Sequence, residues 1–280
     1  MRDGRRAAAR LLAATLALET NASAEPVAEP GAEPPASTRA EPPEETPTEH
    51  WSKAPSRPFV GGILEAGAVV RGRALAGYGK PHYTWGGAVL DGTTTTEFGS
   101  VAAGARLALV LLDVTVSYRK TWSYVRGFPA PRGTYESEDL RVHPRASYGA
   151  LDVSTWGLFP APAGYGEWEF EAHRLYGVPA GRDVYEEWVR GVMGPGWNFA
   201  TRLGYAVSFA GDRGSAGVVG EWVTLGGRGS VFRVGPLASW AFSGEWDLGL
   251  VLTATVSSPD SLSFYDGTYG TLRLRYRFST

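Results

Sequence analysis

The chain has 280 residues and a formal net charge of -2, and 43% of its residues are hydrophobic. This composition excludes a wholly disordered chain, and the small net charge gives no generic attraction to nucleic acid. There is no cysteine, so disulfides are excluded, but there are 37 glycines, 10 tryptophans and 13 tyrosines. Glycine and aromatic residues together favour β-structure with tight turns. Because the protein has no disulfides, its stability must come from a large buried or closed sheet.

Residues 1–24 have the pattern of a secretory signal peptide. A basic start, MRDGRR, precedes the short apolar stretch AAARLLAATLAL, and Ala22 and Ala24 stand in the small-x-small arrangement of a cleavage site. The apolar stretch is too short to span a bilayer and is interrupted by Arg10. We therefore expect export and cleavage after Ala24. An anchor helix or a disordered start is the alternative.

Residues 25–57 are rich in proline and glutamate and offer almost nothing to a hydrophobic core. Such a composition predicts a solvated, disordered tether that is partly polyproline-like. It serves either as a spacer or partner-binding strip, or as a leader with no dedicated partner. Trp51 is its one candidate for docking onto the folded part.

Residues 58–280 form a series of alternating segments separated by short turns. In 197–210, for example, Trp197, Leu203 and Phe209 fall on one face and Arg202 on the other. A soluble β-sandwich also alternates. However, these segments are longer than the about five or six residues of ordinary strands and match the roughly nine to eleven of membrane strands. Because hydrocarbon requires every backbone group to be paired, such strands must close into a barrel.

The pattern therefore predicts an all-β fold, a closed antiparallel transmembrane β-barrel of about ten strands within a range of eight to twelve. The expected strands are 59–72, 99–110, 113–126, 145–159, 166–178, 197–210, 216–225, 230–243, 246–257 and 269–278. An even count places both termini on the side of the short turns. The expected long loops on the other side are 73–98, 127–144, 179–196 and 258–268. The pattern does not decide the secondary structure of two segments. Residues 82–92 could be a further strand, and residues 184–193 could be a strand or a helix.

Aromatic residues gather near the ends of the apolar faces, as in the interfacial girdles of membrane barrels. The expected girdle consists of Trp122, Tyr124, Trp168, Trp197, Phe209, Trp240, Phe242, Trp246 and Phe278. If these faces meet lipid, the charged residues of the opposite faces point into the lumen.

The expected lumen network consists of Glu167, Glu169, Glu171, His173, Arg202, Arg233, Arg273, Arg275 and Arg277. Charges inside a barrel must pair, because burying them alone costs several kcal/mol. The arginines of the last strand are the natural counter-ions for the glutamates. Either these acid and base ladders lock a filled lumen, or they line a narrow water path that selects small ions or polar solutes.

The signal-like start, the alternating strands and the terminal YGTLRLRYRF resemble bacterial outer-membrane β-barrel proteins of porin-like architecture. The resemblance covers about residues 58–280 and identifies no particular protein. It implies an outer-membrane location, contact with membrane lipid and lipopolysaccharide, and assembly by the barrel-assembly machinery, which recognises a terminal aromatic residue. Phe278 would be that residue, but Ser279 and Thr280 follow it.

Three functions stay open. The leading one is non-enzymatic, a structural barrel or a narrow channel. The second is an outer-membrane hydrolase of lipid or peptide, with His173 beside Glu171 as an acid–base pair, although the motifs of such enzymes are not matched. The third is a surface-binding barrel that uses aromatic residues of its external loops. The four histidines are scattered, so neither a metal nor a cofactor is expected.

Overall fold

The computed structural model describes residues 45–141, 145–262 and 268–280. The expected signal peptide, and the expected tether as far as residue 44, lie outside these described residues. In the described ranges, no helix is long and apolar enough to cross a membrane.

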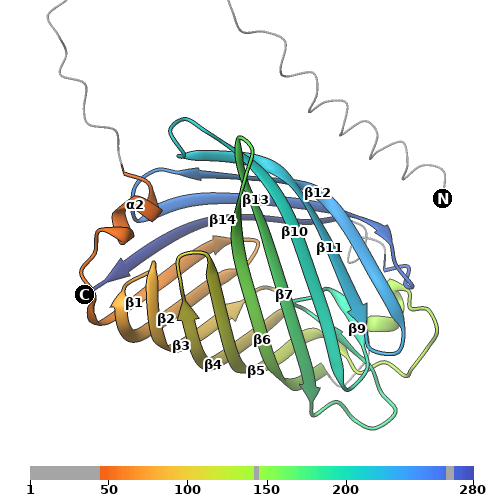
Figure 1. The fold of residues 1–280 in the computed structure, drawn as a ribbon. Coiled ribbons are helices and arrows are strands. Elements are labelled where there is room, and N and C mark those ends of the chain that lie inside the picture. Colours follow the sequence, from red (N-terminus) through yellow and green to blue (C-terminus); the bar gives the residue numbers. More distant parts are fainter. Residues whose placement is uncertain (1–44, 142–144, 263–267) are drawn as a thin grey trace, which may run out of the picture. The chain divides into compact units, whose positions relative to one another are not determined.

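Twelve long strands close into one antiparallel barrel (Figure 1). Neighbouring strands follow one another along the chain, and the first and last long strands pair to close the ring. The all-β closed barrel predicted from the sequence is therefore confirmed, with twelve strands in place of about ten. The strands are β1 Arg57–Gly67, β2 Val70–Lys80, β3 Thr84–Thr94, β4 Phe98–Ala108, β5 Leu112–Gly127, β6 Arg145–Ala161, β7 Gly164–Tyr176, β10 Trp197–Phe209, β11 Gly214–Leu225, β12 Gly229–Ala241, β13 Trp246–Ser257 and β14 Thr268–Ser279.

The expected long loop 73–98 was wrong, because this stretch holds most of β2 and all of β3. The further strand left open at 82–92 is β3. Leu75, Trp85 and Val89 of these strands face inward and are buried in a cluster with residues of β1 and β4. On the outer face only Val70, Tyr78 and Leu90 are large and exposed, and most other outward positions hold glycine or alanine, so the apolar outer face is sparser than in the other strands.

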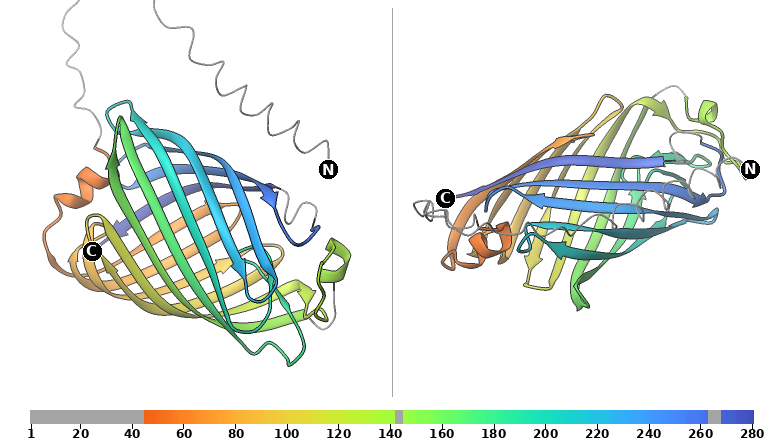
Figure 2. Two further views of the ribbon diagram at one scale, coloured as in Figure 1. Left: turned by 45° about the vertical axis from the view of Figure 1, so that its right-hand side comes forward. Right: turned by 90° about the horizontal axis from the view of Figure 1, so that it is seen from above.

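Connections differ between the two ends of the barrel. At the end that carries the start of β1 and the end of β14, here called the turn end, strands are joined by the short turns 81–83, 109–111, 162–163, 210–213 and 242–245. The opposite end, the loop end, carries the long connections 128–144, 177–196 and 258–267. Figure 2 shows the C-terminus at one end and the 3₁₀-helix η1, Ser137–Leu140, at the other.

The outer faces of the strands are strongly apolar. Leu203 is 61% exposed, Val218 56% and Trp222 53%. Large contiguous apolar surfaces are rare on soluble monomers, whereas hydrocarbon favours them. Of the expected girdle residues, seven are exposed on this wall and two, Trp168 and Trp240, are half-buried. The seven are Trp122, Tyr124, Trp197, Phe209, Phe242, Trp246 and Phe278.

The last part of the segment expected as a tether is a short helix, α2, Pro47–Ser52. Thr46 caps its first turn in a capping box with Glu49. Trp51 is buried, and its ring centroid lies 4.5 Å from that of His82 in the turn between β2 and β3. Trp51 thus attaches α2 to the turn end of the barrel.

We expect this attachment of α2 to weaken in acid. Burial lowers the pKa of the His82 side chain to about 4. On release, His82 would regain its ordinary pKa of about 6.5 and take up a proton first, so the docked state loses stability as the pH falls from about 6.5 towards 4. Fluorine NMR of fluorotryptophan-labelled protein, with the Trp51 signal assigned by Trp51→Phe, should report the release. The response should disappear in His82→Asn, and a response that persists there would exclude His82 as its origin.

Candidate functional site: the charged barrel interior

Strand β14 presents three arginines to the interior at alternate positions, because side chains two residues apart share a face. Arg275 lies directly between Glu65 of β1 and Asp247 of β13 in the strand register. Its Nε atom is 3.3 Å from the Glu65 carboxylate and 3.5 Å from that of Asp247. Arg277 pairs with Asp247, and the Nη1 atom of Arg273 is 3.9 Å from Glu65. The closing seam of the barrel is therefore bridged by ion pairs on its inner side.

The same wall continues into β2 and β3. Asp91 of β3 accepts hydrogen bonds from Arg71, at 2.7 Å, and from Arg73, at 3.0 Å. Further round, Arg106 of β4 pairs with Asp113 of β5 at 2.7 Å. Each contact joins neighbouring strands, so the pairs follow from register once the arginines face inward.

A second row of alternating charges crosses four strands on β7, β10, β11 and β12. Arg202 lies between Glu169 and Glu221 in the register, at 2.7 Å and 3.0 Å from their carboxylates. Glu221 also pairs with Arg233, at 2.8 Å. Glu167 has its side chain over Gly204, where an added Cβ would come within 2.7 Å of it.

His173 lies between two carboxylates. Its Nδ1 atom is 2.8 Å from Asp152 and its Nε2 atom is 3.3 Å from Glu171. The ring is buried. Both nitrogens contact acids, so His173 links Asp152 of β6 to Glu171 of its own strand.

A hairpin of the connection 177–196 folds into the loop end of the barrel. It consists of β8, Val184–Glu186, and β9, Gly191–Met193, and the sequence left this segment open between strand and helix. Its residues Val184, Val189 and Met193 are buried in an apolar cluster against the inner faces of the wall strands. The loop end of the bore is thus filled by protein.

Wall arginines hold the hairpin by its acids and its backbone. Arg119 of β5 donates to Glu186, at 3.0 Å, and Arg126 of β5 donates to Glu187, at 2.6 Å. Arg233 of β12 donates to the backbone carbonyls of residues 189 and 190, at 3.1 Å and 2.7 Å. These arginines keep wall partners as well, namely Asp152, Glu97 and Glu221.

The tip of the hairpin reaches the far wall. The Trp188 ring lies 5.0 Å from the Arg71 guanidinium of β2 and 5.8 Å from that of Arg119. Cation–π contacts of this kind are worth about 0.5–2 kcal/mol, more when dry. With Arg233 on β12 at its other side, the hairpin spans the bore.

The long connections are tied to one another above the hairpin. Tyr135 of the 128–144 connection donates its hydroxyl to Asp183, at 2.7 Å, and its backbone N–H to Asp260, at 3.0 Å. Arg228 of the β11–β12 turn lies 4.4 Å from the Tyr135 ring centroid and pairs with Asp260. Burial and the Asp183 carboxylate raise the pKa of the Tyr135 hydroxyl, which therefore stays a donor. These contacts join the loop-end connections to one another.

The interior is not dry throughout. The side chains of Arg273, Arg202 and Glu171 are 50%, 33% and 32% exposed, although all three face inward. The Arg233 side chain at the hairpin is only 2% exposed. Solvent therefore reaches the middle of the bore, while the part beside the hairpin is packed.

The predicted lumen residues fall on two walls. Arg202 and Arg233 share a row with Glu169, whereas the contacts of Arg273, Arg275 and Arg277 are to Glu65 and Asp247. The ion pairs of the last-strand arginines are therefore with acids of the neighbouring strands β1 and β13, while the expected glutamates lie on β7, which is not a neighbour of β14 in the barrel. The alternation of side chains along each strand could have identified the wall acids that the sequence analysis missed, but only the register of neighbouring strands shows their partners. These acids are Glu65, Asp91, Asp113, Asp152, Glu221 and Asp247.

In the parts of the chain that the structure describes, no group of three or more His, Asp or Glu residues could hold a metal ion.

No protein-family model matches the sequence, and no curated protein matches it. Among solved structures, a KdgM porin is 7% identical over 79% of this chain and 99% of that chain, with a TM-score of 0.38. The outer membrane protein Omp33 of Acinetobacter baumannii is 12% identical over 80% and 99%, with a TM-score of 0.36. The beta domain of the Bordetella autotransporter BrkA is 12% identical over 80% and 98%, with a TM-score of 0.41. At these scores nothing about function follows from the likeness. By its own strands, apolar outer wall and charged interior, the chain has the architecture of an outer-membrane β-barrel.

Proposed function

We propose that this chain is an outer-membrane channel for small ions or polar solutes, closed at its loop end by the β8–β9 hairpin. The observation that carries the proposal is the solvent exposure of inward-facing charges within a closed wall, above all Arg273. A barrel with a purely structural lumen would pack such side chains, because a half-filled interior forfeits packing and hydrogen bonds.

The charges of the bore would decide what passes. Arginines of β14 and β2 line one wall, and the acids Glu169 and Glu171 of β7 lie on another. A small ion in the wet middle would exchange part of its hydration shell for these groups. Arg273, half exposed and 3.9 Å from its acid, is the cation best placed to attract a passing anion.

The choice of ion provides the test. In a barrel whose hairpin segment, residues 180–194, is replaced by a Gly-Ser linker, Arg273→Gln should shift the anion-to-cation permeability ratio towards cations by about fivefold, as expected for a charge worth about 1 kcal/mol at 4 Å in water. The measurement is the reversal potential of planar bilayers in a KCl gradient. Lys120→Gln is the matched control. Lys120 lies two residues from both Tyr118 and Trp122 along β5 and so shares their outer face, and its loss should leave the permeability ratio unchanged.

Heat-modifiable electrophoretic migration should establish first that each variant forms the barrel, and membrane fractionation should place the parent in the outer membrane. Folded protein that carries no current, with and without the hairpin, would exclude a channel and favour the structural alternative. An equal shift of the ratio in Lys120→Gln would exclude the role given to Arg273.

A further inference from the structure

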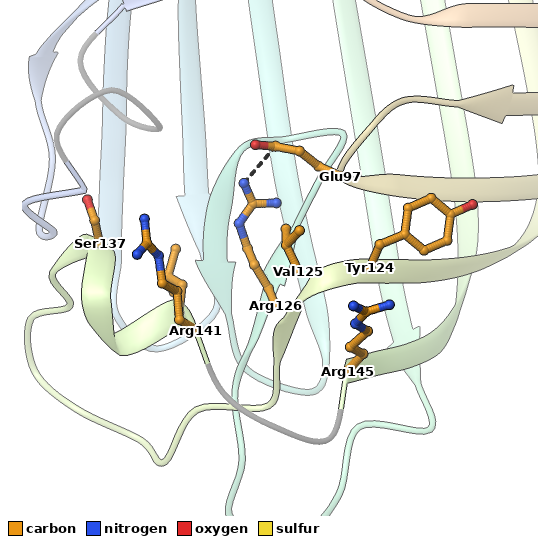
Figure 3. A pocket seen from close by; sticks show the side chains of 8 residues that line it. Glu97, Tyr124, Val125, Arg126, Ser137, Arg141 and Arg145 are labelled. Atoms are coloured by element: carbon orange, nitrogen blue, oxygen red, sulfur yellow. Dashed lines mark hydrogen bonds and ion pairs between the residues drawn. The ribbon is translucent and has the colours of Figure 1, made fainter.

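A pocket of about 380 Å³ lies at the rim of the loop end (Figure 3). It forms where the end of β5, the start of β6 and η1 meet. Arg126, Arg141 and Arg145 line it together with Tyr124 and Val125. Figure 3 shows Arg126 directed towards Glu97, with Arg141 on one side of it and Arg145 on the other.

The pocket has a surplus of positive charge. Arg126 is buried and already paired, with Glu97 at 2.7 Å and Glu187 at 2.6 Å. Arg141 and Arg145 are exposed, and neither has an ion pair with any of the described residues. Guanidinium groups bind phosphate oxygens in pairs and are the preferred partners of phosphate in proteins. Two uncompensated guanidiniums match the charge of a phosphate monoester.

One side of the pocket belongs to the apolar outer wall. The pairing of β5 with β6 shifts register between Trp122 and Gly127, and within this irregular stretch the consecutive residues Tyr124 and Val125 are both exposed. The Tyr124 backbone N–H donates to the Glu97 carbonyl at 2.7 Å, which fixes the stretch against the β3–β4 turn. Trp122 continues the exposed apolar surface along the strand. A cationic pocket thus adjoins the surface on which acyl chains would lie.

In outer-membrane barrels the long connections face the cell exterior, which places the loop end and its pocket at the outer leaflet. We propose that this pocket binds the phosphate group of a phosphorylated lipid of that leaflet. Arg141 and Arg145 hold the phosphate, while the lipid chains run along Trp122 and its neighbours. A pocket of this volume accommodates a phosphate and part of the group that bears it. The inference rests on the outer-membrane location proposed above but not on conduction.

Lipid retention tests this site. The parent, Arg141→Gln/Arg145→Gln and the control Arg57→Gln/Arg182→Gln are reconstituted in phosphatidylcholine nanodiscs doped with lipid A, and native mass spectrometry counts the lipid A that stays bound. The control removes the same charge from exposed arginines that do not line the pocket. Lipid A retention should fall about tenfold or more in the pocket variant, since hydrogen bonds to charged groups are worth about 1.5–3 kcal/mol, and should remain at the parent level in the control.

Two further arms separate lipid from free phosphate. Dephosphorylated lipid A should not be retained by the parent, and millimolar inorganic phosphate should fail to displace lipid A. Equal retention by parent and pocket variant, or equal loss in the control, would overturn the site. Displacement by inorganic phosphate would overturn the lipid as its ligand. In the barrel whose residues 180–194 are replaced by a Gly-Ser linker, the two pocket substitutions should leave the bilayer conductance unchanged, so the two proposals can fail separately.

Discussion

Replacing residues 180–194 with a short Gly-Ser linker is expected to convert a barrel without resolved current into one with discrete conductance steps. The replaced segment contains the β8–β9 hairpin, which spans the bore between Arg233 and the Trp188 contact with Arg71. Because β7 and β10 are adjacent and pair from Arg174 to Trp197, a short linker can join them. The measurement is single-channel recording in planar bilayers.

The wall should survive this replacement. Each arginine that holds the hairpin keeps an acid on the wall, so none becomes an isolated buried charge. As a matched control, residues 131–134 of the other long connection are replaced by Gly-Ser. These four residues are exposed and do not include Tyr135, which bonds Asp183. Their replacement should therefore leave the recording as in the parent. A folded hairpin-less barrel that stays silent would contradict the assignment of the hairpin as the plug.

The second large effect is expected from Arg119→Met. Arg119 is buried and joins Glu186, which is 0% exposed, to Asp152 of the wall. Removing one partner of a buried ion pair leaves an uncompensated charge and costs roughly 3–5 kcal/mol. Asp152 keeps His173, so most of the cost falls on Glu186. The expected result is release of the hairpin, seen as faster hydrogen exchange of residues 184–193 and as the appearance of channel openings.

The double variant Arg119→Met/Glu186→Gln distinguishes the effect of the uncompensated Glu186 carboxylate from the effect of losing the Arg119 side chain itself. With no stranded carboxylate, it should recover most of the protection of the hairpin and close the channel again. In the hairpin-less barrel, Arg119→Met should cost less free energy of unfolding, measured in urea, than in the parent. If the double variant is as unprotected as the single one, the Arg119–Glu186 pair does not hold the plug.

The sequence was informative wherever a strand has a full-sized apolar outer face. The predicted strand 246–257 coincides with β13, in which Leu252 and Val256 face outward and Asp247 faces the interior. The same rule failed for β2 and β3, since Trp85 and Val89 point inward and most outer positions hold glycine or alanine, with few large apolar residues such as Leu90 among them. Period-two alternation states which residues share a face but not which face meets lipid.

The charged interior was predictable only by residue type. Parity along β14 is enough to place Arg273, Arg275 and Arg277 on one face. Which acid each one contacts depends on the register of neighbouring strands, and for Arg275 these neighbours are separated from each other by most of the chain. The plug could not be predicted from the sequence. Glu186 and Glu187 lie in a long connection, and their partners are arginines of the distant strand β5.

The seam between β1 and β14 also limits how this protein can be built. Gly61 pairs with Ser279 and Gly67 with Arg273, so the sheet is sealed by two strands that lie far apart along the chain. Until this pairing forms, the edge of β1 has unmade hydrogen bonds that hydrocarbon does not tolerate. Such a long-range pairing is also slow to form unaided. Insertion therefore requires either a late, concerted step or a helper that temporarily covers the open edge.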